Sequence, residues 1–212
     1  MEILVHCLKI VRARESCTGN LLRLLEQLRI MTPKSSSRSQ AGPEIRIGYG
    51  WDSHEFKSGI LLRIGGIEIP HPKGLGGHSD GDVLLHAITD ALLGALAAPD
   101  IGTLFSPSDS RWKGADSSLF LAESLRRVKS ADYVIVNLDS TLILAQPKIG
   151  PHVDAIRESL CRLLEISGDR IGIKAKTPEG MGTENAAIAH AVVLLHRGPS
   201  QRVSRTGRKR SA

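Results

Sequence analysis

Acidic and imidazole side chains fall in two short stretches of this chain, at a spacing that could bind a metal ion. Asp52 and His54 follow the alternating run Ile45–Tyr49, and a two-residue spacing places both side chains on the same side of an extended backbone. His86 lies in an apolar run that is typical of a helix. One carboxylate and two imidazoles, from the end of a strand and from a helix, would leave a tetrahedral zinc ion one open position, as in catalytic zinc sites. A hydrogen-bonded structural histidine explains the spacing equally well.

The helix that would carry His86 is predicted from residue 82 to residue 96, with Ser79 or Asp80 as its cap. Its apolar residues recur at helical spacing and would face the core.

Asp82, His86 and Asp90 recur every four residues, so they share one face of this helix. A charged helix face is usually only a solvated one. The alternative interpretation is that Asp82 or Asp90 accepts a hydrogen bond from the second ring nitrogen of a metal-bound histidine.

Length and composition predict one soluble domain. A chain of 212 residues with 41% hydrophobic content can bury one sizeable core. No apolar run approaches the ~18 residues of a membrane span, and no signal-peptide pattern opens the chain, so we expect a cytoplasmic protein. Cys7, Cys17 and Cys161 are odd in number and lack CxxC spacing, which argues against a disulfide framework and against a thiolate metal site.

The net charge of +6 raises the alternative of a nucleic-acid-binding protein. Residues 1–44 hold 7 basic and 4 acidic residues, and residues 197–212 hold 6 basic residues and no acidic one, so residues 45–196 are slightly acidic. The basic end lacks interleaved aromatic residues for base stacking. We therefore expect no specific nucleic-acid binding, and at most weak, salt-sensitive contact with polyanions.

Composition shifts divide the chain into a domain with two extensions. Residues 1–44 are expected to be an N-terminal extension, with an amphipathic helix at 20–30 and a polar linker from Thr32 to Pro43. Residues 45–197 are expected to form the folded domain, and residues 198–212 a basic, disordered tail.

Strand-like and helix-like periods alternate within that domain. Runs rich in branched apolar residues predict strands, and runs with apolar residues three or four apart predict helices. The predicted strands are 45–49, 60–70 with a turn at Gly65-Gly66, 133–145, 171–176 and 187–196, and the predicted helices are 82–96, 115–129 and 151–164. This order predicts an α+β fold with helices packed on a sheet.

Several blocks of the domain occur in the order found in one enzyme family. The blocks are Arg46–Phe56, Gly65–Pro70, His78–Asp82, Leu85–Ala87, Thr89–Gly94, Asp100–Gly102, Leu104-Phe105, Lys113–Ser117, Pro147-Lys148 and Pro151-His152. With these blocks the chain resembles the 2-C-methyl-D-erythritol 2,4-cyclodiphosphate synthases of the non-mevalonate isoprenoid pathway, over about residues 45–197.

This resemblance implies a homotrimer of α+β subunits, each with a mixed β-sheet and helices packed on one face, and active sites between neighbouring subunits. It implies the conversion of 4-diphosphocytidyl-2-C-methyl-D-erythritol 2-phosphate to 2-C-methyl-D-erythritol 2,4-cyclodiphosphate, with release of CMP. A zinc-dependent hydrolase of another phosphate ester is the alternative that the metal ligands alone would allow.

The resemblance also implies roles for individual residues. Asp52, His54 and His86 would bind zinc, and Glu179 would help to bind a second ion, magnesium or manganese. His78 and Thr177 would stabilise the transition state. Residues expected to bind the substrate are Ser79, Asp100, Gly102, Phe105, Leu144, Lys148, Ala175 and Lys176.

The chain departs from the family before its last predicted strand. Where many members carry Gly-Arg-Gly-Glu, this chain has Met181–Ala186 without an arginine. In the family that the chain resembles, this arginine commonly lines the trimer axis, where a diphosphate ligand can bind, so we expect no tight binding of an isoprenoid diphosphate by this chain.

Overall fold

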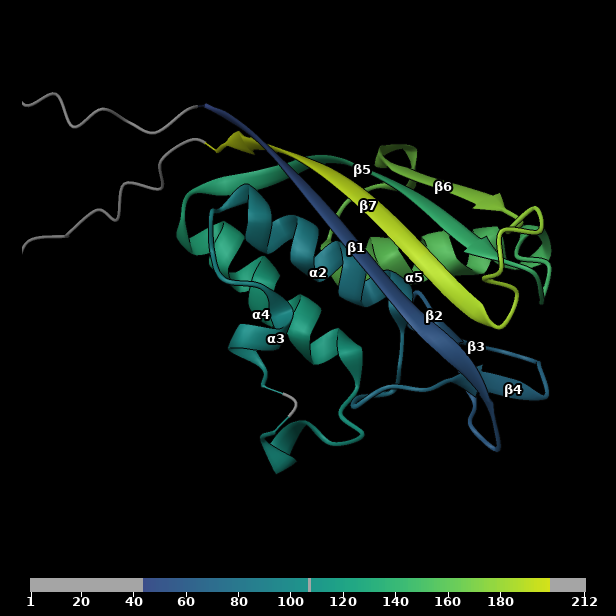
Figure 1. The fold of residues 1–212 in the computed structure, drawn as a ribbon. Helices are drawn as coiled ribbons and strands as arrows, with labels where there is room; N and C mark the ends of the chain where they lie inside the picture. The colour runs from purple at the N-terminus through teal and green to yellow at the C-terminus, as the bar shows by residue number, and fades with distance from the viewer. Residues whose placement is uncertain (1–43, 107, 199–212) are drawn as a thin grey trace, which may run out of the picture. The chain divides into compact units, whose positions relative to one another are not determined.

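The computed structural model describes residues 44–106 and 108–198. The strands of the main sheet are β1 (Ile45–Ser58), β4 (Lys73–Leu75), β5 (Tyr133–Leu144), β6 (Ile171–Lys176) and β7 (Ala186–Arg197). Their order across the sheet is β4-β1-β7-β5-β6 (Figure 1). Every neighbouring pair is antiparallel except β5 and β6, which are parallel, so the sheet is mixed.

Three longer helices pack on one face of this sheet (Figure 1). They are α2 (Val83–Ala95), which contacts β1 and β7, α4 (Ser117–Ser130), which contacts β5, and α5 (Val153–Leu164), which contacts β6. The shorter helical turns are α3 (Ile101–Leu104), η1 (Ser110–Trp112), η2 (Gly150–His152) and η3 (Gly168–Arg170). The buried apolar side chains between helices and sheet form one continuous core.

Side chains of β1 alternate between the two faces of the sheet. Gly48, Gly50 and Phe56 are buried toward the helices, whereas Ile47 is 70% exposed and Trp51 49% exposed on the other face. Val192 of β7 and Val134 of β5 are exposed apolar residues of the neighbouring strands. An apolar area of this kind, spread over adjacent strands, is typical of an interaction surface.

Strands β2 (Leu62–Ile64) and β3 (Ile67–Ile69) form a separate two-stranded hairpin. Its two-residue turn is Gly65-Gly66, with φ of 66° and 78°. Positive φ at both turn residues matches the twist of the hairpin, and glycine adopts it without strain.

The predicted α+β class, mixed sheet and longer elements are confirmed. The predicted turn at Gly65-Gly66 is correct, and so is the assignment of 187–196 as a strand despite its many alanines. The predicted helix 20–30 lies outside the described residues, and so do residues 199–212 of the predicted tail. Within the described residues, no helix is both long enough and apolar enough to span a membrane.

Two predictions of local structure were wrong, and two short elements were missed. β1 continues to Ser58, so the pair predicted to follow its end lies inside the strand. α2 is capped by Asp82, whose carboxylate accepts hydrogen bonds from the first-turn N–H groups, and not by Ser79 or Asp80. The short elements β4 and α3 were not predicted, because three or four residues are too few to show a period.

Candidate functional site

Strand β1 and helix α2 approach each other closely because two glycines of β1 face the helix. A Cβ atom added at Gly48 would lie 1.8 Å from the carbonyl oxygen of Ala91, and one added at Gly50 would lie 1.9 Å from that of Ala87. Only glycine allows a helix backbone so near a strand. The contact places α2 against the part of β1 that carries two of the predicted metal ligands.

The three predicted metal ligands meet at this contact. Oδ2 of Asp52 lies 2.8 Å from Nδ1 of His86 and 2.9 Å from Nε2 of His54, and the two histidine nitrogens are 3.1 Å apart. Asp52 and His54 are on the same side of β1, as their spacing predicts, and that side faces the helices. All three side chains are largely buried, with 27%, 17% and 11% exposed for Asp52, His54 and His86.

Burial and charge act in opposite directions on these groups. Burial raises the pKa of Asp52, but hydrogen bonds from His54 and His86 outweigh it, so the pKa lies well below its ordinary value. Burial lowers the pKa of His54, but the hydrogen bond to Asp52 and its negative charge outweigh it, so the pKa lies above its ordinary value. Asp52 is therefore held as a carboxylate that attracts positive charge.

The donor set fits a divalent metal ion. One ligand atom from each of Asp52, His54 and His86 lies within 4.8 Å of the others. Two imidazole nitrogens and one carboxylate oxygen are ligands that zinc and other divalent transition metals accept. The facing atoms are close enough for one ion to contact all three.

The other ring nitrogen of His86 faces two serines. Nε2 lies 2.8 Å from Oγ of Ser117 and 3.0 Å from Oγ of Ser79. The predicted acceptors Asp82 and Asp90 both bind other groups, so the prediction that one of them supports His86 was wrong.

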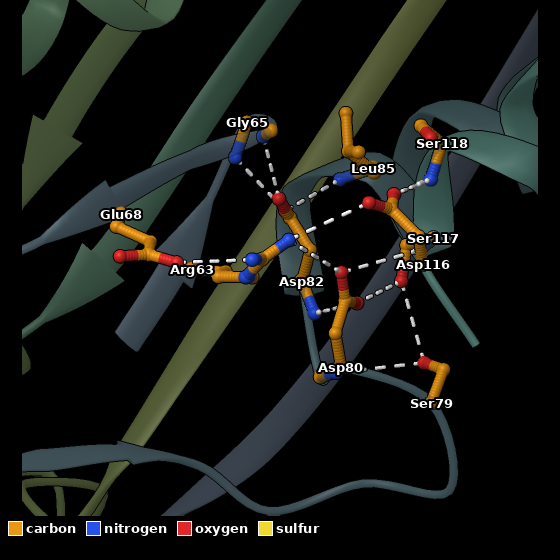
Figure 2. Close-up of polar contacts among 12 residues, drawn as sticks. Arg63, Gly65, Glu68, Ser79, Asp80, Asp82, Leu85, Asp116, Ser117 and Ser118 are labelled. Carbon is orange, nitrogen blue, oxygen red and sulfur yellow. Dashed lines mark hydrogen bonds and ion pairs between the residues drawn. The ribbon is translucent and has the colours of Figure 1, made fainter. Parts of the chain in front are cut away.

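The Asp82 carboxylate joins the start of α2 to the β2–β3 hairpin. It accepts hydrogen bonds from the backbone N–H groups of Gly65, Gly66, Leu84 and Leu85, at 2.7 to 3.2 Å. Figure 2 shows Gly65 and Leu85 beside Asp82. Burial raises the pKa of Asp82 above its ordinary value, and these N–H groups oppose that rise. Asp82 therefore has a structural role that helps to fix the helix carrying His86.

Asp90 and Asp100 fix the short helix α3. The Asp90 carboxylate accepts a hydrogen bond from the Ile101 N–H at 2.8 Å, and burial raises its pKa. Asp100, a predicted substrate-binding residue, is the N-cap of α3 and accepts a hydrogen bond from the Thr103 N–H at 2.7 Å, which lowers its pKa. Asp100 does not line the cavity beside α3, whereas Gly102 does.

A cavity of about 150 Å³ opens beside the metal ligands. Six of the predicted site residues line it: His54, His78, Ser79, His86, Gly102 and Phe105. The structure therefore brings the predicted zinc ligands together with His78, Ser79 and the α3 segment.

A second cavity, of about 370 Å³, lies at the ends of β5 and β6. The predicted residues that line it are Leu144, Lys148, Ala175, Lys176, Thr177 and Glu179. The Thr177 hydroxyl donates a hydrogen bond to the Glu179 carboxylate. Among the described residues the two cavities share no lining residue, so one chain holds the predicted site residues in two groups.

Three residues that line the first cavity were not predicted: Ile101, Trp112 and Phe120. Phe105, Trp112 and Phe120 form an aromatic cluster, with ring centroids 4.6 to 5.6 Å apart. The sequence held a signal for this wall. The chain has only 3 Phe and 2 Trp, and two of these residues, Trp112 and Phe120, lie on either side of the Lys113–Ser117 block in the sequence.

Comparisons with known proteins identify the family of the chain. The chain is 60% identical over 153 residues to 2-C-methyl-D-erythritol 2,4-cyclodiphosphate synthase of Koribacter versatilis, covering 72% of this chain and 99% of that protein. A solved structure of a protein with this name has 48% identity and a TM-score of 0.68, over 71% of this chain and 99% of the other. Another solved structure, a form bound to CDP, has 46% identity and a TM-score of 0.68, over the same shares. The model of the YgbB family matches residues 45–196, and with these relatives it shows that the chain belongs to that family.

Proposed function

We propose that this chain is a 2-C-methyl-D-erythritol 2,4-cyclodiphosphate synthase. The observation that carries the proposal is the meeting of Asp52, His54 and His86 beside a cavity. The chain is also 60% identical to a synthase of that name, over 72% of this chain and 99% of the synthase. The substrate is 4-diphosphocytidyl-2-C-methyl-D-erythritol 2-phosphate. The products are 2-C-methyl-D-erythritol 2,4-cyclodiphosphate and CMP.

The reaction is an internal phosphoryl transfer. An oxygen of the 2-phosphate bonds to the β-phosphorus of the diphosphate, and the bond from that phosphorus to the bridging oxygen breaks, so that CMP leaves with the electron pair. The attacking phosphate is already ionised and is tethered to its target, so the protein needs to supply orientation and charge stabilisation and no nucleophile of its own.

Asp52, His54 and His86 would hold zinc, and Glu179 would help to hold magnesium or manganese on the diphosphate. A bound divalent ion polarises phosphoryl oxygens and offsets their charge during the transfer. Asp52 and His54 lie on β1 and His86 lies on α2. These two elements pack closely against each other at Gly48 and Gly50. Such preorganisation lowers the cost of binding a metal in a fixed geometry.

The remaining predicted residues would position the substrate. Ser79 and His78 line the first cavity beside the metal ligands and would contact phosphate oxygens. Gly102 and Asp100 would hold the methylerythritol hydroxyls from α3, and Phe105 would form an apolar wall.

The second cavity would bind the cytidine part of the substrate. Its residues Leu144, Lys148, Ala175 and Lys176 lie beside Thr177, whose hydroxyl is close enough to Glu179 for both to act on one diphosphate. Binding of CDP by a solved relative with 46% identity supports a cytidine diphosphate ligand.

A homotrimer would join the two groups of residues into complete sites. The first cavity of one subunit would face the second cavity of its neighbour, and the exposed apolar face around Ile47, Trp51 and Val192 would be covered in the assembly. This arrangement explains why each chain carries two partial sites.

Complementation between two inactive variants tests the shared site. His86→Ala damages the first group, and Thr177→Ala damages the second. If sites form between subunits, co-expression of the two variants restores about a quarter of the parent activity, because one site in four combines two intact halves. Activity no higher than that of either variant alone would assign each complete site to a single chain.

The catalytic domain would comprise residues 45–197, with residues 1–44 and 198–212 as extensions, and a cytoplasmic location remains a prediction. Product analysis separates the synthase from the alternative, a zinc-dependent hydrolase, which the comparisons do not favour. A synthase yields CMP and a cyclic diphosphate, whereas a hydrolase yields a linear phosphate ester.

A further inference from the structure

We infer that Ser117 and Asp80 are positioning residues that fix the ring of His86, so that its Nδ1 atom and not its Nε2 atom is offered to the metal. This inference rests on the proposed metal-dependent function and concerns two residues outside the proposed catalytic, metal-binding and substrate-binding sets. It follows from the donors and acceptors around the Nε2 atom.

The direction of the Ser117 hydroxyl is determined by Asp80. Oγ of Ser117 donates a hydrogen bond to Oδ1 of Asp80, because a carboxylate can only accept (Figure 2). The single hydroxyl proton of Ser117 is therefore used for Asp80. Toward His86, 2.8 Å away, the same oxygen has only lone pairs to offer, so Nε2 of His86 must carry the proton.

A protonated Nε2 leaves Nδ1 as the nitrogen available to a metal. Nδ1 is also the atom that faces Asp52 at 2.8 Å and His54 at 3.1 Å. The hydrogen-bond direction and the position of the other two ligands thus select the same atom of the ring. In metal sites, a partner on the second ring nitrogen fixes the tautomer and orientation of a ligating histidine.

Backbone contacts hold Ser117 and Asp80 in register. The Asp80 N–H donates to the Ala115 carbonyl at 3.0 Å, and the Gly114 N–H donates to the His78 carbonyl at 2.8 Å. Asp80 also accepts hydrogen bonds from the Ser117 N–H at 3.3 Å and from the Asp82 N–H at 3.2 Å. The loop before α2 and the start of α4 are therefore joined directly behind His86.

Arg63 of the hairpin completes the surroundings of Asp80. Its guanidinium lies 3.8 Å from Asp80, 3.4 Å from Asp116 and 3.0 Å from Glu68 (Figure 2). Hydrogen bonds and an ion pair thus connect His86 through Ser117 and Asp80 to Arg63, which also pairs with Asp116 and Glu68. Ser117 is fully buried, so water cannot freely take the place of its hydroxyl group.

Metal affinity is the first test. Ser117→Ala removes the nearer of the two hydroxyl oxygens that face Nε2 and leaves that of Ser79 at 3.0 Å, and we expect zinc affinity, measured by competition with a chromophoric chelator, to fall about 10–100-fold. Ser117→Thr keeps a hydroxyl and should restore most of the affinity. The matched control is Ser124→Ala, which removes another buried serine of α4, bonded to the Leu121 carbonyl, and should leave the affinity unchanged. Unchanged affinity in Ser117→Ala would overturn the inference.

Nuclear magnetic resonance of the unmodified protein is the second test and does not use the Ser117 variants. In zinc-loaded protein with ¹⁵N-labelled histidine, the His86 signal, identified by its loss in His86→Ala, should show a proton on Nε2 and none on Nδ1. A proton on Nδ1 would overturn the inference. Neither test uses turnover. A chain that makes the cyclic product with His86 bound through Nε2 would therefore refute this inference alone, and a chain that binds zinc through Nδ1 but makes no product would refute only the proposed function.

Discussion

Nδ1 of His86 on helix α2 lies 2.8 Å from Oδ2 of Asp52 on strand β1, although the two residues are 34 positions apart in the chain. The contact depends on how closely the helix approaches the strand. Gly48 and Gly50 permit this approach, so the packing of the core and the geometry of the metal site depend on the same residues.

Gly50→Ala is therefore expected to damage both the fold and the site. The new Cβ would lie 1.9 Å from the Ala87 carbonyl oxygen, and the helix backbone cannot easily move. We expect a loss of at least about 1–3 kcal/mol in the free energy of unfolding, measured in denaturant on metal-free protein. Gly94→Ala is the control, because its Cβ would meet only the Tyr49 carbonyl oxygen at 3.6 Å. Equal stability of the two variants would contradict this account of the β1–α2 contact.

Replacing His86 by alanine should remove one of three metal ligands while the apolar face of α2 keeps the fold. Loss of a ligand should lower zinc affinity by more than the about 10–100-fold that is expected when only a hydrogen-bond partner of a ligand is lost. Metal analysis after equilibration with zinc measures the occupancy, and His71→Ala, which removes an imidazole outside the triad, is the control. A folded His86→Ala protein with full zinc occupancy would refute the assignment.

Glu179→Gln should change the response to magnesium or manganese and leave zinc binding intact. The substitution keeps the size of the side chain beside Thr177 but removes the charge that a hard cation prefers. Activity titrated with each ion at fixed zinc should require a higher magnesium concentration for half-maximal turnover. Glu184→Gln, which neutralises an exposed glutamate of another cavity, is the comparison. The proposed role fails if both variants respond to magnesium as the parent does.

The long elements could be predicted because their side chains alternate or recur over many residues. Asp52 and His54 could be placed on one face of a strand for the same reason, and the structure bears this out. That the strand continues to Ser58 could not be predicted, since residues 52–58 are mostly polar, and pairing with β7 and β4 extends the strand there.

The residues that contact His86 could not be predicted from the sequence, for a different reason. Spacing identified Asp82 and Asp90 as neighbours on one helix face, but their carboxylates bind backbone N–H groups of the hairpin and of α3. The groups that reach His86 are Ser79 and Ser117, and Ser117 comes from another helix. Contacts between distant segments are set by tertiary packing, which local periodicity does not encode.

A shortened chain lacking residues 1–40 and 199–212 is expected to fold, to form a trimer and to keep its turnover. The described strands begin at Ile45 and end at Arg197, and the two ends pair with each other through the Arg197 N–H and the Glu44 carbonyl at 2.7 Å. Light scattering and a turnover assay measure both properties against the full chain. A monomeric or inactive shortened chain would show that the extensions belong to the working enzyme.

The proposed reaction is tested most directly by incubating the purified chain with 4-diphosphocytidyl-2-C-methyl-D-erythritol 2-phosphate, zinc and magnesium, and following the products by phosphorus NMR. CMP and the 2,4-cyclodiphosphate should appear in equal amounts, and neither should form with His86→Ala. A linear phosphate product, or no CMP from a folded, metal-loaded chain, would contradict the proposed function.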